Sequence, residues 1–237
     1  MSRDLSVVGR ALSAPARSVM LNLLMDGSER PATELAGAAG VGAPGASEHL
    51  AVLVDAGLVS VTRRGRQRFY RLADAAVAAA LEQLGQLCPP APVITYRQTR
   101  QARELARARL CYDHLAGRLG VALTQAMQDL AWLRSDADLT VTTRGRQALA
   151  LIGIDATSSA ASRRPLSRTC PDWTERRPHL GGRLGAMIAS HAISSAWVAR
   201  STHGRGLTVT PAGVLAFQAH WHVPADVFLL PLAATDA

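Results

Sequence analysis

Residues 43–72 read APGASEHLAVLVDAGLVSVTRRGRQRFYRL. The spacing of the apolar residues changes within this stretch from that of a helix to that of a β-strand, and this change decides the fold. The first half predicts a helix from Ala43 to Asp55, which Gly57 can end because glycine tolerates the left-handed backbone of a helix C-terminus. The second half predicts a β-hairpin, with strands at 58–62 and 68–72 and a polar tip between them. The residues expected on the inner face of the helix are Leu50, Leu53 and Val54.

Three shorter helices are expected before this stretch. The apolar spacing predicts one helix that ends near Ser13 and a second that begins at Pro15, where the missing N–H costs nothing. A third helix covers residues 31–36, and residues 40–42 form a turn. The apolar residues expected to line the first two helices are Leu5, Val8, Leu12, Val19, Leu23 and Leu24. This order is that of a winged helix-turn-helix, in which the last helix enters the DNA major groove and the hairpin lies on the neighbouring backbone.

Three motifs in this region resemble the ArsR/SmtB family of regulators. They are ALSAPAR at 11–17, Ser47-x-His49-Leu50 and DAGLV at 55–59, and an arginine-rich hairpin follows them. The resemblance covers about a third of the chain. It implies a homodimer, usually a repressor, that releases double-stranded DNA when an inducer binds. It also implies that the first helix and residues 74–87 form the dimer interface.

The sequence of residues 74–87 supports a dimer independently of the resemblance. Its apolar stripe, which is larger than a small wing needs, consists of Ala76, Val77, Ala80, Leu81, Leu84 and Leu87. A twofold dimer would bind two half-sites about one helical turn apart, so we expect an inverted-repeat operator.

The metal sites that are familiar in this family have no counterpart here. The helix before the recognition helix lacks the thiolate pair, because residues 33–39 contain no cysteine. The helix after the hairpin offers only Asp74 and Glu82 as ligands. No familiar family metal motif can therefore be assigned.

Candidate DNA-binding residues lie on the recognition helix and on the hairpin. The polar residues of the helix that could read bases are Ser47, Glu48 and His49. Those of the hairpin that could contact phosphates or enter the minor groove are Arg63, Arg64, Arg66 and Arg68. The alternatives are a solvated charged hairpin, and a His49 side chain that packs at the edge of the helix.

The charge of the chain fits an acidic partner such as nucleic acid. All 26 basic residues are arginine and the formal net charge is +8. The excess is uneven, with 9 Arg against 8 acidic residues in 1–92 and 17 against 10 in 93–237. Four arginines at helical spacing form either a solvated face or an added DNA contact, and they are Arg97, Arg100, Arg103 and Arg107.

The composition also limits the class of protein. A chain of 237 residues with 48% hydrophobic residues can form one large or two ordinary domains. No segment approaches the ~20 apolar residues of a membrane helix, and the charged start does not resemble a signal peptide, so we expect a cytoplasmic protein with no membrane partner. Three cysteines do not suggest a disulfide framework.

The prolines at 89–92 mark the expected domain boundary, because they stop a helix and stiffen the connection. We predict a winged helix-turn-helix at 1–88, a linker at 89–96 and an effector domain at 97–237. The fold class is mainly α with small β-hairpin wings. Two similar segments, 139–145 and 207–213, each read as a strand that runs into a helix start. They indicate winged-helix-like pieces in the second domain, unless Leu-Thr-Val-Thr is merely a common strand.

Two strings in the second domain carry metal-type or thiol chemistry. Residues 109–117 and 170–180 resemble an extended subgroup of the same family, from which no ligand can be assigned. Cys111 and His114 are expected on one predicted helix, with side chains that point together. That helix has an apolar stripe of Leu105, Ala108, Tyr112, Leu115 and Leu119. The second string is expected to be irregular and offers Cys170, Asp172 and His179.

The preferred interpretation is a repressor that is released by an effector sensed at these two strings. The cofactor is unknown. A thiophilic metal such as zinc, a disulfide between Cys111 and Cys170, an organic effector and an inert buried cysteine all remain open. A second possibility is a constitutive architectural DNA-binding protein without an inducer. An enzyme fused to a DNA-binding module is a third, but no catalytic motif is visible.

Overall fold

The computed structural model describes residues 4–88, 96–136, 138–156, 164–201 and 204–228, and the chain divides into two compact units, Met1–Leu81 and Glu82–Ala237. The predicted boundaries at 1–88, 89–96 and 97–237 stay a prediction, because residues 89–95 lie outside the described residues. No helix in the described part of the chain is both long and apolar enough to cross a bilayer.

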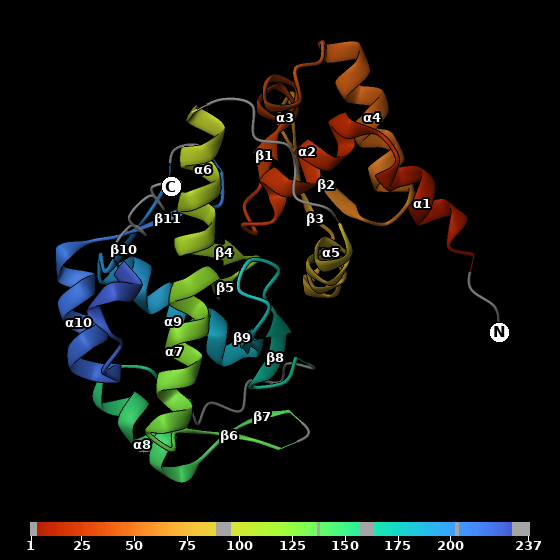
Figure 1. Ribbon diagram of the computed structural model, residues 1–237. Helices are drawn as coiled ribbons and strands as arrows, with labels where there is room; N and C mark the ends of the chain where they lie inside the picture. Colours follow the sequence, from red (N-terminus) through yellow and green to blue (C-terminus); the bar gives the residue numbers. More distant parts are fainter. Residues whose placement is uncertain (1–3, 89–95, 137, 157–163, 202–203, 229–237) are drawn as a thin grey trace, which may run out of the picture. The chain divides into compact units, whose positions relative to one another are not determined.

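The first unit has the predicted winged helix-turn-helix fold (Figure 1). Strand β3 pairs with both β1 and β2, so the hairpin is the larger part of a three-stranded antiparallel sheet. The short strand β1 is not apparent from the sequence. The elements are α1 (Ser6–Leu12), α2 (Pro15–Leu24), β1 (Arg30–Pro31), α3 (Ala32–Ala39), α4 (Ala43–Asp55), β2 (Val59–Arg64), β3 (Gln67–Leu72) and α5 (Ala75–Leu87), which continues into the second unit.

The core of this unit follows the predicted pattern on α4 and departs from it on α2. Leu50 and Leu53 are fully buried, and each contributes about 1.5–3 kcal/mol of transfer free energy. On α2 the buried residues are Met20, Leu21 and Leu24. The expectation for Val19 is wrong, since its side chain is 41% exposed. The buried face of α2 is shifted by about one residue from the predicted one. The predicted and the observed sets of buried residues both fit a 3.6-residue period, so the spacing alone does not distinguish them.

The second unit is built from helices and two-stranded hairpins. After α6 (Tyr96–Arg107), two copies of the same sequence of elements follow, each a hairpin, a helix, a second hairpin and a second helix (Figure 1). The first copy is β4 (Arg109–Cys111), β5 (His114–Ala116), α7 (Gly117–Asp129), β6 (Leu133–Ser135), β7 (Leu139–Val141) and α8 (Thr143–Leu151). The second copy is β8 (Arg168–Pro171), β9 (Pro178–Gly181), α9 (Gly182–Ser194), β10 (Val198–Arg200), β11 (Leu207–Val209) and α10 (Pro211–Trp221), followed by the 3-10 turn η1 (Ala225–Phe228).

Shared details show that the two copies are structural repeats, which we call repeat 1 (109–151) and repeat 2 (168–221). Thr142 and Thr210 each cap a helix by accepting a hydrogen bond from the N–H of the residue three positions on. Ala131 and Ala196 stand before the second hairpins with φ of +58° and +54°. The similar segments at 139–145 and 207–213 are the strand-to-helix junctions of the two repeats.

The predicted single helix through Cys111 and His114 is wrong, because a hairpin stands there. Cys111 ends β4, His114 begins β5, and the two are register partners across a two-residue turn. Tyr112 in that turn has a φ of +63°, which a helix cannot accommodate. Both strands are buried on both faces, so their apolar run lacks the alternation that distinguishes a half-exposed strand from a helix. The second string, expected to be irregular, forms the hairpin β8–β9 around a six-residue loop at 172–177.

Replacement of Gly213 by alanine should destabilise the second unit. The added Cβ would lie 1.9 Å from the carbonyl oxygen of Trp197, so the backbone must move. We expect a loss of about 1–3 kcal/mol or more in the free energy of unfolding, measured by urea denaturation. The control is Gly37→Ala on α3, where an added Cβ meets nothing within 4 Å and should be neutral or stabilising. Equal stability of Gly213→Ala and the unaltered chain would contradict this packing.

Candidate functional site

The solvent-facing part of α4 carries few polar groups. Ser47 and Glu48 are exposed, and the Ser47 hydroxyl donates a hydrogen bond to the Ala43 carbonyl of its own helix. His49 is half-buried, and its Nδ1 lies 3.2 Å from a guanidinium nitrogen of Arg17. Ser47 and Glu48 are therefore presented to solvent, whereas one side of the His49 ring is committed to the protein.

The four hairpin arginines differ in their surroundings. All are exposed, but Arg64 forms an ion pair with Glu29, and its guanidinium lies 4.9 Å from the centre of the Phe69 ring. Arg63 and Arg68 are direct register partners across β2 and β3. With Arg66 they form no ion pair with any residue that the structure describes. Like charges placed directly opposite each other in a sheet repel, so this hairpin is suited to an anionic partner.

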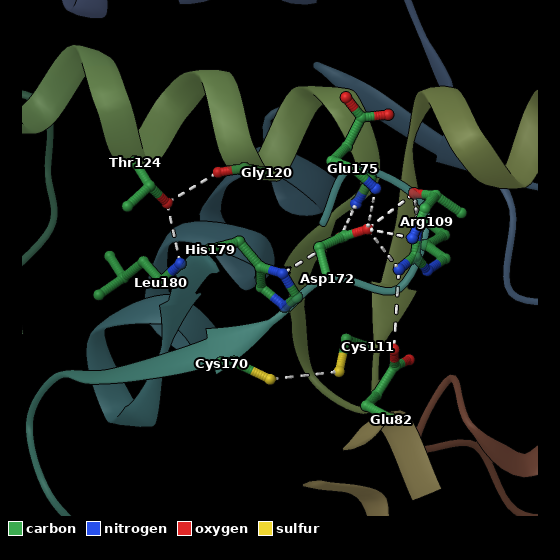
Figure 2. Close-up of polar contacts among 12 residues, drawn as sticks. Glu82, Arg109, Cys111, Gly120, Thr124, Cys170, Asp172, Glu175, His179 and Leu180 are labelled. Carbon is green, nitrogen blue, oxygen red and sulfur yellow. Dashed lines mark hydrogen bonds and ion pairs between the residues drawn. The ribbon is translucent and has the colours of Figure 1, made fainter. Parts of the chain in front are cut away.

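A buried cluster of two cysteines and two histidines lies in the second unit. Its members are Cys111, His114, Cys170 and His179, and we call it the Cys-His cluster. Their ligand atoms all lie within 4.8 Å of one another, and all four side chains are buried. The two sulfurs face each other at 3.8 Å (Figure 2). The fold thus brings together four of the five residues selected from the two sequence strings.

The fifth residue, Asp172, lies behind the cluster rather than in it. Its Oδ2 is 3.1 Å from Nδ1 of His179 (Figure 2). The same oxygen accepts a hydrogen bond from the Gly117 N–H at the start of α7. Asp113 has the equivalent position in repeat 1, with Oδ1 3.2 Å from Nδ1 of His114. Each histidine is thus oriented by a carboxylate on Nδ1, and its Nε2 remains available.

The electrostatics of the cluster follow from burial and from these contacts. The Cys170 thiol and burial raise the pKa of Cys111 to about 12, so this thiol keeps its proton in the absence of a cation. Burial opposes the charged form of each histidine. The carboxylates of Asp113 and Asp172, together with Cys111, nevertheless raise the pKa of both rings above its usual value.

A buried ion-pair network supports this arrangement. Arg109 is fully buried, its guanidinium is 3.0 Å from Asp172 and 3.7 Å from Glu82, and its Cζ lies 5.0 Å from the Trp173 ring. Burial would raise the pKa of Asp172, but His179 and Arg109 hold it well below its ordinary range. Sequence reasoning assigned no role to Arg109 and counted Glu82 only as an inadequate metal ligand.

The sequence contained a signal that could have identified the cluster. Arg109-x-Cys111-x-Asp113-His114-Leu115 matches Arg168-x-Cys170-x-Asp172 and, after six inserted residues, His179-Leu180. Gly-Arg-Leu-Gly follows in both, at 117–120 and 182–185. The six-residue loop hides the repeat from a comparison at fixed spacing.

A small apolar cavity adjoins the cluster between α7 and α9. Its lining residues are Leu115, Gly120, Leu123, Thr124, Leu180, Gly185 and Ile188. It has room for about one water molecule, far below the ~300 Å³ of a typical organic-ligand pocket. This cavity therefore gives no support to an organic effector.

Comparison with known proteins gives matches over both parts of the chain. The family described as bacterial regulatory protein, arsR family, matches residues 14–61. An uncharacterized HTH-type transcriptional regulator of Bacillus subtilis, YdfF, is 36% identical over 224 residues, which cover 94% of this chain and 99% of that protein. The likeness to this relative therefore extends through both repeats.

Two further matches cover about a third of the chain. The HTH-type transcriptional regulator CmtR of Mycobacterium tuberculosis is 42% identical over 83 residues, covering 35% of this chain and 70% of that protein. The homodimeric winged helix-turn-helix DNA-binding domain Mb0332 of Mycobacterium bovis is 36% identical, with a TM-score of 0.31, and the match covers 34% of this chain and 75% of that one.

Asp172→Asn should strongly destabilise the second unit. The change leaves the buried Arg109 without its nearest carboxylate, and loss of one partner from a buried pair costs about 3–5 kcal/mol. The control is Asp136→Asn, which breaks a solvent-exposed 2.7 Å pair with Arg134 and should cost about 0–1 kcal/mol. Chemical denaturation of both variants measures the difference. If the two variants were equally stable, the buried pair of Arg109 and Asp172 would not stabilise the fold.

Proposed function

The chain belongs to the ArsR family of bacterial regulatory proteins, and on this premise we propose that it is a homodimeric cytoplasmic repressor that binds an inverted-repeat operator and is released by an effector. Helix α4 reads the major groove, with Ser47 and Glu48 as its exposed polar residues and with the free side of His49. Arg63, Arg64, Arg66 and Arg68 are the phosphate or minor-groove contacts of the hairpin. The effector acts at the second unit.

The observation that carries the DNA part of this proposal is the arginine pair of the hairpin. Arg63 and Arg68 stand opposite each other without a described acidic partner, so the free protein bears an uncompensated repulsion. A DNA phosphate between the two guanidinium groups would relieve it and form charge-assisted hydrogen bonds. This also explains how a segment with almost no net charge can bind a polyanion, because the positive charge is concentrated on one hairpin.

The dimer is supported by apolar side chains that one copy of the chain leaves in solvent. Leu5 is 76% exposed just before α1, and Leu84 and Leu87 on α5 are 41% and 83% exposed. A second copy of the chain would cover them, in keeping with the interface that the family resemblance implies. Because a twofold dimer presents two identical α4 helices, it favours an operator with twofold symmetry.

The effector part of the proposal is supported by the Cys-His cluster and the carboxylate of Asp172. No familiar family metal motif exists in the first unit, whereas the second unit gathers thiol and imidazole groups in one buried place. Cys111, His114, Cys170, Asp172 and His179 are therefore the proposed effector-responsive residues.

The double substitution Arg63→Ala/Arg68→Ala should weaken binding to all DNA sequences alike. Each arginine that contacts a phosphate contributes about one unit to the slope of log K against log salt, so a dimer should lose up to about four units. Fluorescence anisotropy at several salt concentrations, with operator and random DNA, measures both quantities. The charge-matched control is Arg134→Ala/Arg144→Ala in repeat 1, two exposed arginines outside the hairpin. An unchanged affinity and slope in the hairpin variant would contradict the docking.

Leu84→Asp/Leu87→Asp should convert the dimer into a monomer, because two carboxylates would have to be buried in the interface. Sedimentation at micromolar concentration measures the change, and the variant should also lose affinity for a two-half-site operator. The control is Leu151→Asp/Leu215→Asp, on two leucines that are 89% and 68% exposed on α8 and α10. A monomeric unaltered chain that binds DNA one to one would refute the dimer.

A further inference from the structure

We propose that Cys111, His114, Cys170 and His179 bind one thiophilic divalent cation, with zinc as the reference ion, in a closed tetrahedral site that joins repeat 1 to repeat 2. This inference deepens the proposed function by naming the class of ligand that the second unit takes. Only the effect of the bound ion on DNA binding rests on the proposed function. The binding site itself is argued from the geometry of the second unit.

The separation of the sulfurs matches that of two thiolate ligands on one metal ion. Two Zn–S bonds of about 2.3 Å at a tetrahedral angle place the sulfurs about 3.8 Å apart. The distance between the Sγ atoms of Cys111 and Cys170 is 3.8 Å, and both cysteines are free. The thiols are thus reduced and in hydrogen-bond contact, at a spacing that one metal ion could bridge with little movement of either sulfur.

The histidines provide a second, independent observation. Nε2 of His114 and Nε2 of His179 are buried and have no hydrogen-bond partner within the described residues, and the two side chains are 1% and 0% exposed. An unsatisfied buried ring nitrogen costs free energy, so two of them in one place call for an explanation. A cation that accepts the lone pair of each Nε2 supplies it.

The contacts of the opposite ring nitrogens prepare Nε2 for this role. Asp113 lies 3.2 Å from Nδ1 of His114, and Asp172 lies 3.1 Å from Nδ1 of His179. A carboxylate beside Nδ1 favours the tautomer that leaves the lone pair on Nε2, as in the carboxylate–histidine–zinc arrangement. The contact of His179 with Asp172 is an ion pair at 3.1 Å that lacks hydrogen-bond geometry. Both repeats place an acidic residue in this position, although Asp113 adjoins its histidine and Asp172 is separated from His179 by six residues.

The ligand set indicates which ions fit and what the site can do. Two thiolates and two imidazoles favour zinc and softer cations over magnesium or calcium, which prefer oxygen. Four buried protein ligands leave no open position for a water or a substrate. A closed site of this kind supports structure or switching rather than catalysis.

The site lies between the two repeats, so an ion bound there would connect them. Each repeat contributes one cysteine and one histidine, which are register partners in its own first hairpin. The packing is reciprocal, since a Cβ on Gly120 of repeat 1 would lie 3.6 Å from Cβ of His179, and one on Gly185 of repeat 2 would lie 3.0 Å from Cβ of His114. A single ion would thus cross-link two repeats whose contacts at this place are reciprocal.

Metal titration of the full-length protein tests the site. The reduced protein is stripped with a chelator, dialysed and titrated with zinc chloride against a chromophoric competitor, and with cobalt(II) chloride as a spectroscopic probe. We expect one ion per chain, a tetrahedral cobalt spectrum with thiolate charge-transfer bands, and no competition from magnesium. Cys111→Ser and Cys170→Ser should each weaken zinc binding at least tenfold. The control is Cys88→Ser, an exposed cysteine outside the cluster, which should bind as the unaltered chain does.

The outcomes separate this inference from the proposed function. Failure of the unaltered chain to bind one zinc ion, or undiminished binding by Cys111→Ser/Cys170→Ser, would overturn the site whatever the DNA result. If a serine variant does not fold, the cobalt spectrum of the unaltered chain decides, because an octahedral spectrum without charge-transfer bands would exclude the two sulfurs. Zinc binding by a chain that shows no operator preference would leave the site intact and remove the proposed repressor function.

Discussion

The contact between Arg109 and Asp172 is the interaction on which the second unit depends. An arginine that is fully buried must be matched by carboxylate oxygens, because an uncompensated interior charge is too costly to retain. Asp172 meets this demand at 3.0 Å and at the same time contacts His179 and accepts a hydrogen bond from the N–H of Gly117. One carboxylate therefore fixes the loop of repeat 2, the start of α7 in repeat 1 and the ring plane of a cluster residue.

The two repeats share the residues of the Cys-His cluster but differ in the surroundings of those residues. Asp172 is buried against Arg109, whereas Asp113 is partly exposed and forms an ion pair with Arg164. The loop between cysteine and histidine is two residues long in repeat 1 and eight residues long in repeat 2. In both, the cysteine and the histidine face each other across a hairpin and a carboxylate meets Nδ1. The two repeats therefore have the same local geometry at the cluster although their loops differ in length.

In the first unit, the residues that form the core differ from those that carry the positive charge. Its core includes buried side chains of α4 and of the hairpin, such as Leu50, Leu53 and Leu72, whereas the arginines of the hairpin are exposed. Arg64 is held by Glu29 and Phe69, which gives the hairpin one ordered side chain, while Arg63 and Arg68 face solvent. The nearly neutral composition of residues 1–92 is thus compatible with a locally basic surface on the hairpin.

The sequence by itself determined the winged helix-turn-helix, the family and the identity of the residues in the Cys-His cluster. These depend on local period, on short motifs and on the chemistry of side chains, all of which are visible along the chain. It failed at Cys111 and His114, where strands buried on both faces resemble a helix, and at Val19, where two helix faces fit the same spacing. Only the tertiary structure decided that two hairpins 59 residues apart meet through their cysteines. Packing between the repeats produces that contact, the role of Arg109 and the place of Asp172 behind His179. Such a long-range arrangement cannot be read from the spacing or the composition of the sequence.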